Sequence, residues 1–276
     1  HASVARDIAM GNFQRQTEVV PKWLLRATEM ADEFIVDDRG DELLQMQIFR
    51  DTLASYAELK SGEFDAGVAI DEALKAGRQM IREAHDHYFK IQVERMLAES
   101  LFHASRIHRT RGDYDTAMMY ANNALGLLDG SREEWQLVAH DDYLEAKLHF
   151  LVGSVYAVRD NDHDEAVSYY ARARRLLVKS PGFTSPLYSD RSHGEMCVSM
   201  GLSYWEVGEQ EEAMQLTMQG ATIMKDAVED GTLKLESMQV PYGNLAAMHN
   251  QLGNATRSKE FAKLVARINE IKSKTR

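Results

Sequence analysis

The pattern of apolar and polar positions along the chain is that of helices separated by short turns. Between Gly112 and Leu125, a glycine closes one helix, an aspartate starts the next, and small residues recur on one face of the second helix. Four other places follow the same order, and glycine and asparagine are the residues best suited to a left-handed helix end. The five turn residues are Gly62, Gly112, Asn161, Gly208 and Gly253. The pattern therefore predicts five helical hairpins.

Small residues recur at fixed distances on both sides of these turns. Where two antiparallel helices cross, a small residue on each helix lets the backbones approach without a clash. The residues seven positions before the turns are Ser55, Ser105, Ser154, Gly201 and Ala246. The residues five positions after them are Gly67, Ala117, Ala166, Ala213 and Ser258. Twelve positions after the turns the rule holds for Ala124, Ala173 and Gly220, but not for Leu74 and Val265. These positions are predicted to mark the helix crossings.

These residues resemble the tetratricopeptide repeat, which has a small residue on its first helix, a glycine turn followed by an aromatic residue, and alanines on its second helix. Phe64 and Tyr114 match the aromatic residue, whereas His163, Gln210 and Ala255 depart from it. The resemblance covers about residues 42–272 and implies an all-α fold, a right-handed α-solenoid of antiparallel helix pairs with about 11–12 helices.

The predicted repeats are longer than the 34 residues of a standard tetratricopeptide repeat. Successive turn residues lie about 45 to 50 positions apart, so that each helix should run to about 20 residues, near 30 Å. In this respect the chain looks like the extended repeats of kinesin light chain and of bacterial peptide-sensing regulators.

The predicted organisation is an N-terminal helical cap over residues 1–41, followed by one continuous solenoid domain. Pro21 fits the first turn of a cap helix from Pro21 to Val36, which would cover the apolar end of the stack. The helix-breaking run from Lys179 to Pro186 is expected to be a loop between the third and fourth repeats. The five repeats are expected at approximately 42–88, 89–130, 131–180, 185–230 and 231–276.

Composition and charge narrow the class of partner. Only four prolines, with abundant alanine, leucine, methionine, glutamate and arginine, favour helix and leave almost no strand. The net charge of -11 argues against nucleic acid or an anionic membrane as the partner. The single cysteine, Cys197, excludes an internal disulfide, and no apolar run approaches a membrane span. We expect a cytoplasmic protein, although a chain that starts at His1 leaves a removed targeting segment open.

No motif in the sequence carries catalytic chemistry. There is no phosphate-binding glycine loop, no His-Glu-x-x-His motif and no nucleophile elbow. His85, Asp86 and His87 are close in sequence, but residues two apart on a helix point to different faces, so we interpret them as solvated surface. The chain is expected to be no enzyme and to need no cofactor and no metal.

The surface that a helical stack offers is a concave face lined by the first helix of each repeat. The candidate peptide-binding residues on this face are Tyr56, Lys60, Phe102, His103, Arg106, Arg109, Arg159, Trp205, Asn244 and Asn250. The basic residues among them would favour a partner with an acidic segment, because arginine binds carboxylates through two parallel hydrogen bonds. An equally weighted alternative is that these arginines pair with acidic residues of adjacent repeats.

Three functions follow as hypotheses. The first is a scaffold or adaptor that binds a protein or peptide in the concave groove. The second is the sensory segment of a signalling protein whose output domain lies outside this chain, and the third is an enzyme with a dispersed site, which would require a buried cluster of ionisable residues. Self-association into a homodimer is left open.

Overall fold

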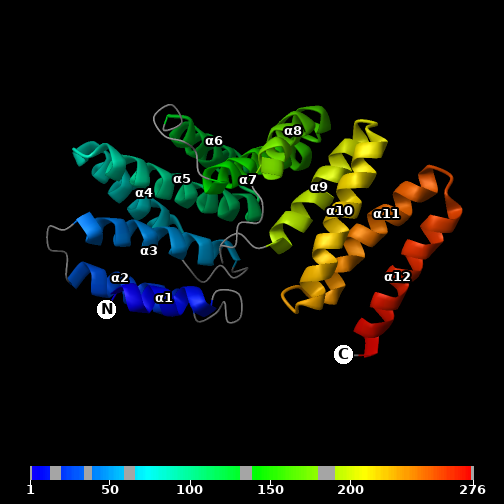
Figure 1. Ribbon diagram of the computed structural model, residues 1–276, viewed down its shortest axis with the longest axis horizontal. Coiled ribbons are helices and arrows are strands. Elements are labelled where there is room, and N and C mark those ends of the chain that lie inside the picture. Colours follow the sequence, from blue (N-terminus) through cyan, green and yellow to red (C-terminus); the bar gives the residue numbers. More distant parts are fainter. Residues whose placement is uncertain are drawn as a thin grey trace. The chain divides into compact units, whose positions relative to one another are not determined.

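The computed structural model describes residues 2–12, 20–33, 39–58, 66–130, 139–179 and 190–274. Within these ranges every regular element is a helix and none is a strand (Figure 1). The all-α class and the expected number of helices are confirmed, because twelve α-helices lie in the described residues. Four prolines and a helix-favouring composition account for this outcome.

Contacts divide the chain into two compact units. Unit 1 consists of His1–Val155 and Arg172–Leu187, and unit 2 consists of Tyr156–Ala171 and Tyr188–Arg276. The boundary falls inside helix α8 (His163–Lys179), which therefore contributes to both units. The division into a cap and five repeats stays a prediction.

Unit 1 begins with two short helices that pack against each other, α1 (Ala2–Asn12) and α2 (Val20–Glu33). The helix expected from Pro21 corresponds to α2, and its predicted last residues, 34–36, lie outside the described ranges. Helix α1 was not predicted. Its buried face consists of Ala2, Ala5 and Ala9, and alanines give little hydrophobic contrast in a sequence.

The rest of unit 1 consists of longer helices that pack in sequence order. They are α3 (Arg39–Glu58), α4 (Ala66–Glu83), α5 (His87–Thr110), α6 (Tyr114–Gly130) and α7 (Ala139–Val155). Helix α3 packs against α4 and α5, and α5 packs against α6 and α7. The first helices of three successive predicted repeats, α3, α5 and α7, are therefore neighbours.

Unit 2 continues the same helical pattern. It contains the π-helical segment η2 (Tyr156–Asp160), the first part of α8, α9 (Asp190–Glu206), α10 (Gln210–Glu229), a 3-10 segment η3 (Leu235–Met238), α11 (Gln239–Gln251) and α12 (Ala255–Lys274). One core cluster, which includes Val198, Met224, Met238, Leu245 and Ile268, joins α9, α10, η3, α11 and α12. The burial of this apolar cluster is the main force that stabilises the unit.

Four of the five predicted turn residues have the left-handed backbone that ends a helix. The φ angles are 80° at Gly112, 52° at Asn161, 86° at Gly208 and 75° at Gly253, and Gly62 lies outside the described residues. After α5, the Asp113 N–H donates to the carbonyl of His108 at 3.0 Å, which closes the helix end. The predicted turns are thereby confirmed at the four described positions.

The predicted helix crossings are confirmed in the second and fourth hairpins. The Ser105 hydroxyl of α5 donates to the carbonyl oxygen of Ala117 on α6 at 2.5 Å. A Cβ atom on Gly201 of α9 would lie 2.9 Å from the carbonyl oxygen of Ala213 on α10. Small residues at these positions therefore allow the two backbones to touch.

Candidate functional site

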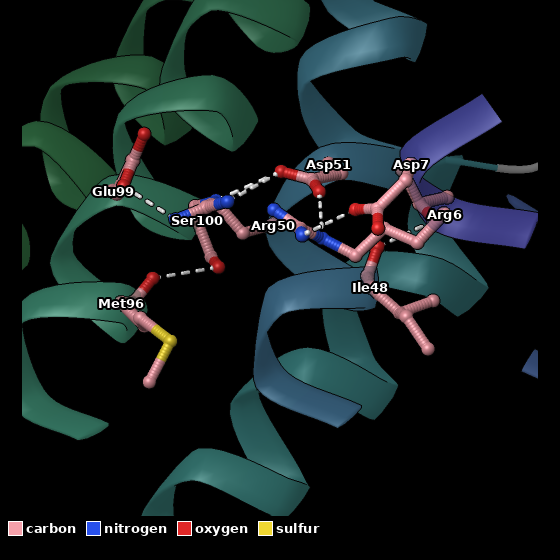
Figure 2. A network of polar contacts seen from close by, with 9 residues as sticks. Arg6, Asp7, Ile48, Arg50, Asp51, Met96, Glu99 and Ser100 are labelled. Carbon is pink, nitrogen blue, oxygen red and sulfur yellow. Dashed lines mark hydrogen bonds and ion pairs between the residues drawn. The ribbon is translucent and has the colours of Figure 1, made fainter. Parts of the chain in front are cut away.

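The candidate site in unit 1 is a layer of charged side chains on the first helices α3, α5 and α7. Asp51 of α3 is fully buried and accepts a hydrogen bond from Nε of Arg6 on α1 at 2.6 Å. Arg50 donates to the same carboxylate through Nε at 2.9 Å and Nη2 at 2.8 Å, and its Nη1 lies 3.4 Å from Glu99 of α5. Figure 2 shows this chain of contacts linking three helices. The network fixes the positions of these charges at the junction of the first helices.

Burial and charge act in opposite directions on the central carboxyl of this network. Burial raises the pKa of Asp51, and the guanidinium groups of Arg50 and Arg6 lower it. Both guanidinium groups donate to the carboxylate, so that three hydrogen bonds from cationic groups take the place of its contacts with solvent. The site is therefore stable only as a complete network.

A second buried charged group lies where α5 faces α7. Lys147 of α7 is only 5% exposed, and its ammonium nitrogen lies 5.1 Å from the ring centroid of Tyr143 and 5.7 Å from that of Phe102. The rings supply cation–π attraction to an ammonium group that has lost most of its hydration.

His103 is a buried polar residue of this layer whose ring makes no hydrogen bond to the residues that the structure describes. It is 1% exposed and lies beside Phe102, with the ring centroids 5.1 Å apart. Burial lowers the pKa of His103 well below its usual range, Arg106 adds to this shift, and Glu99 opposes it. Lys147 and Arg50 also lower this pKa. The folded chain therefore holds His103 in its neutral form.

The free energy of unfolding of unit 1 is expected to decrease as the pH is lowered below about 6.5, the usual histidine pKa. The folded state resists protonation of His103, so the unfolded state binds one more proton at low pH. The free energy of unfolding then changes by up to about 1.4 kcal/mol per pH unit. Urea unfolding between about pH 7 and pH 5 measures this slope, which should become shallower in His103→Gln. The exposed His85 provides the matched control, His85→Gln. Equal slopes in the wild type and His103→Gln would contradict the assignment.

The predicted site residues of unit 1 are found in three different environments. Phe102 and His103 are buried, whereas Tyr56, Arg106 and Arg109 are half-buried. Arg106 of α5 makes an ion pair with Glu58 of α3, at 2.7 Å from Nη2 to Oε1. This is the pairing between adjacent repeats that the sequence predicts as the alternative for the basic residues. Lys60 lies outside the described residues.

The predicted site residues of unit 2 are more scattered. Arg159 lies in the π-helical segment and is bonded to Asp160, at 2.7 Å from Nε to Oδ1. Trp205 of α9 donates from Nε1 to Oε1 of Gln251 on α11 at 3.0 Å, which joins the first helices of two successive predicted repeats. Asn244 is half-buried and Asn250 is exposed. The structure therefore brings together α9 and α11 in this unit through Trp205.

Sequence reasoning missed five buried or half-buried charged residues, namely Arg6, Arg50, Asp51, Glu99 and Lys147. The three that are most buried, Asp51, Glu99 and Lys147, stand at different distances from the turn residue of their own hairpin. A search at fixed positions relative to the turns therefore could not find them. The available signal was weaker, namely charged residues set among the apolar residues of a first helix.

The acidic and histidine-rich segment before α5 caps this helix. The Asp86 carboxylate accepts a hydrogen bond from the Phe89 N–H at 3.1 Å, and His85 and His87 are exposed. Among the described residues, no three histidine, cysteine, aspartate or glutamate side chains lie close enough to hold a metal. None of the helices described is both long and apolar enough to span a membrane.

Comparison with solved structures identifies the fold. The chain superimposes on BtubC (BKLC) from P. vanneervenii with a TM-score of 0.64 and 13% sequence identity, covering 94% of this chain and 92% of that one. It is also similar to the apo form of RapI, with a TM-score of 0.55, 14% identity and coverage of 99% and 84%.

A third similar structure is a Rap protein complexed with competence and sporulation factor. The TM-score is 0.55 at 16% identity, and the match covers 99% of this chain and 76% of that one. The sequence matches no family model and no curated protein. Identities this low establish the architecture alone: the chain has a tetratricopeptide-like helical repeat fold.

Proposed function

We propose that this chain is a protein-binding scaffold that recognises a partner segment through the first helices of its repeats and carries out no chemistry itself. The observation that supports this proposal most strongly is the charged layer on α3, α5 and α7. Buried charges are costly unless they are paired, so a protein that needed only stability would place apolar side chains there. A binding surface, by contrast, gains from charges that are already held in position.

The half-buried edge of this layer supplies the recognition groups. Arg106 and Arg109 lie near the end of α5 and Tyr56 lies near the end of α3. The Arg106–Glu58 pair is partly exposed, with side-chain exposures of 30% and 38%. Partly exposed ion pairs contribute little to stability, so a carboxylate of the partner can replace Glu58 at small cost. An acidic partner segment is therefore the ligand that we propose for this surface.

A sensory or regulatory role is the second candidate. It is supported by the similarity to a Rap protein complexed with competence and sporulation factor. In this candidate the same surface would bind a signal, and an output domain on the same polypeptide or a separate partner would respond. Sequencing of the full-length gene product distinguishes this role from a free-standing adaptor.

Affinity capture from source-cell lysate tests the proposed surface. The double variant Arg106→Glu/Arg109→Glu should lose a partner that the wild type retains, with affinity reduced about tenfold or more, because it places carboxylates where the acidic segment would bind. The matched control is Arg78→Glu/Arg82→Glu, which makes the same charge change on exposed residues of α4. Retention of every partner by the first variant, with an unchanged melting curve, would refute the proposal.

A further inference from the structure

Unit 2 contains an open groove on α10 and α12, the second helices of the last two predicted hairpins. Its volume is about 540 Å³. Its apolar lining consists of Met214 and Met218, one turn apart on α10, and Phe261 of α12. Met218 is 41% exposed, so the groove keeps apolar surface accessible to solvent. Methionine side chains are flexible and adapt to the shape of a bound apolar group.

The polar lining of the groove is basic or neutral. His249, at the end of α11, stacks on Phe261 with the ring centroids 5.7 Å apart and the ring planes 8° apart. The Nδ1 atom of His249 is buried and has no hydrogen-bond partner in the described part of the chain. Arg257 is exposed, and the remaining lining groups are two glutamine amides and a threonine hydroxyl. No carboxylate lines the groove, although the chain carries a net charge of -11.

Arg257 is available to a ligand at small cost. It lies 3.1 Å from Glu260, one turn along α12, and the two side chains are 62% and 54% exposed. An ion pair this exposed is weak, because water screens both charges. The carboxylate of a ligand can therefore compete for the guanidinium group of Arg257 and form two parallel hydrogen bonds with it.

The shape of the groove favours a peptide over an enclosed small molecule. Small-molecule sites bury most of their ligand, whereas here Arg257, both glutamines and the threonine are exposed. We propose that this groove binds a peptide segment of a partner protein, with an apolar anchor side chain between Met214, Met218 and Phe261 and an acidic side chain on Arg257. This surface uses second helices, so the inference does not rest on the function proposed for α3, α5 and α7.

The test uses the whole chain with [ε-13C]methionine and four fluorescein-labelled 12-residue peptides. The first peptide carries one leucine anchor flanked by glutamates; the others replace the leucine with serine, the glutamates with lysines, or both. Methyl NMR spectra report the site, with the Met214 and Met218 signals assigned from Met214→Leu and Met218→Leu. Fluorescence anisotropy gives the dissociation constants, and Arg257→Glu is compared with Arg267→Glu, an exposed residue of α12 that does not line the groove.

We expect the leucine–glutamate peptide to shift the Met214 and Met218 methyl signals and to bind best of the four. Arg257→Glu should weaken its binding about tenfold, and Arg267→Glu should change it about twofold at most. The inference is overturned if the lysine peptide binds equally well, if the two methyl signals do not move, or if Arg257→Glu and Arg267→Glu have equal affinity. Movement of the methyl signals with protein concentration alone would identify a second copy of the chain as the occupant and would also overturn it.

Discussion

Asp51→Ala is expected to lower the free energy of unfolding of unit 1 by about 3–5 kcal/mol, the cost of breaking a buried ion pair. The carboxylate is fully buried and faces the guanidinium groups of Arg6 and Arg50, whose side chains are only 19% and 16% exposed. Without the carboxylate, these two positive charges repel each other in a poorly solvated place. Urea unfolding followed by circular dichroism measures the loss.

Asp7→Ala is the matched control for this prediction. Asp7 also contacts Arg6, at 3.4 Å, but its side chain is 66% exposed. Loss of a contact this exposed should change the stability by about 0.5 kcal/mol or less. If Asp51→Ala and Asp7→Ala proved equally mild, the network would be no more than a set of surface contacts, and the argument from buried charge would fail.

Gly220→Ala is expected to destabilise unit 2 by about 1–3 kcal/mol, the usual cost of forcing an extra carbon into a packed contact. A Cβ atom at this position of α10 would lie 2.5 Å from the carbonyl oxygen of Gly194 and 2.9 Å from the backbone nitrogen of Val198, both on α9. Backbone atoms cannot rotate away as a side chain would. The two helices must therefore separate, and the shared core cluster must open with them.

The matched control, Gly243→Ala, is expected to change the stability in the opposite direction. Gly243 lies within α11 of the same unit, and a Cβ atom there would meet nothing within 4 Å. Gly243→Ala should therefore stabilise the chain by about 0.5–1 kcal/mol, the difference in helix propensity between the two residues. Thermal unfolding of both variants and of the wild type measures the two changes in stability. Stabilisation by Gly220→Ala would show that α9 and α10 do not cross closely at this position.

The sequence could predict the features that recur. Turn residues such as Gly112 and Gly208 can be recognised in the sequence because few residue types adopt positive φ at low cost. Small residues such as Ser105 and Gly201 can be recognised because they recur at a fixed distance from the turns, where the helix crossing leaves no room for a larger side chain. Repetition allows each weak local signal to be tested against the others, which is why the fold could be predicted from one chain.

Features that occur once could not be predicted in this way. Helix α1 buries only alanines, and the π-helical segment at Tyr156 has no counterpart in the other described hairpins. Gly194 completes the close crossing with Gly220 but stands outside the register of the repeats. The ion pairs of Asp51 with Arg6 and Arg50 depend on three-dimensional packing, and the open groove on α10 and α12 depends on side chains that meet only after folding.

The predicted site residues have the same limit, because their burial depends on three-dimensional packing. Positions counted from a turn identify the helix but not its exposed face, so that the predicted site residues include both the buried Phe102 and the half-buried Arg106. The proposed surface now centres on the charged layer of α3, α5 and α7 and on its half-buried edge, which includes Tyr56 and Arg109.

The measurement that tests the central claim most directly is site-specific photo-cross-linking in source-cell lysate. A benzoylphenylalanine is placed at Tyr56 on the first helix α3 and, in a separate sample, at Met119, which is 48% exposed on the second helix α6. Binding through the first helices predicts a partner cross-linked from position 56, absent in Arg106→Glu/Arg109→Glu, and no such product from position 119. A partner captured from position 119 alone, or equally in that double variant, would contradict it.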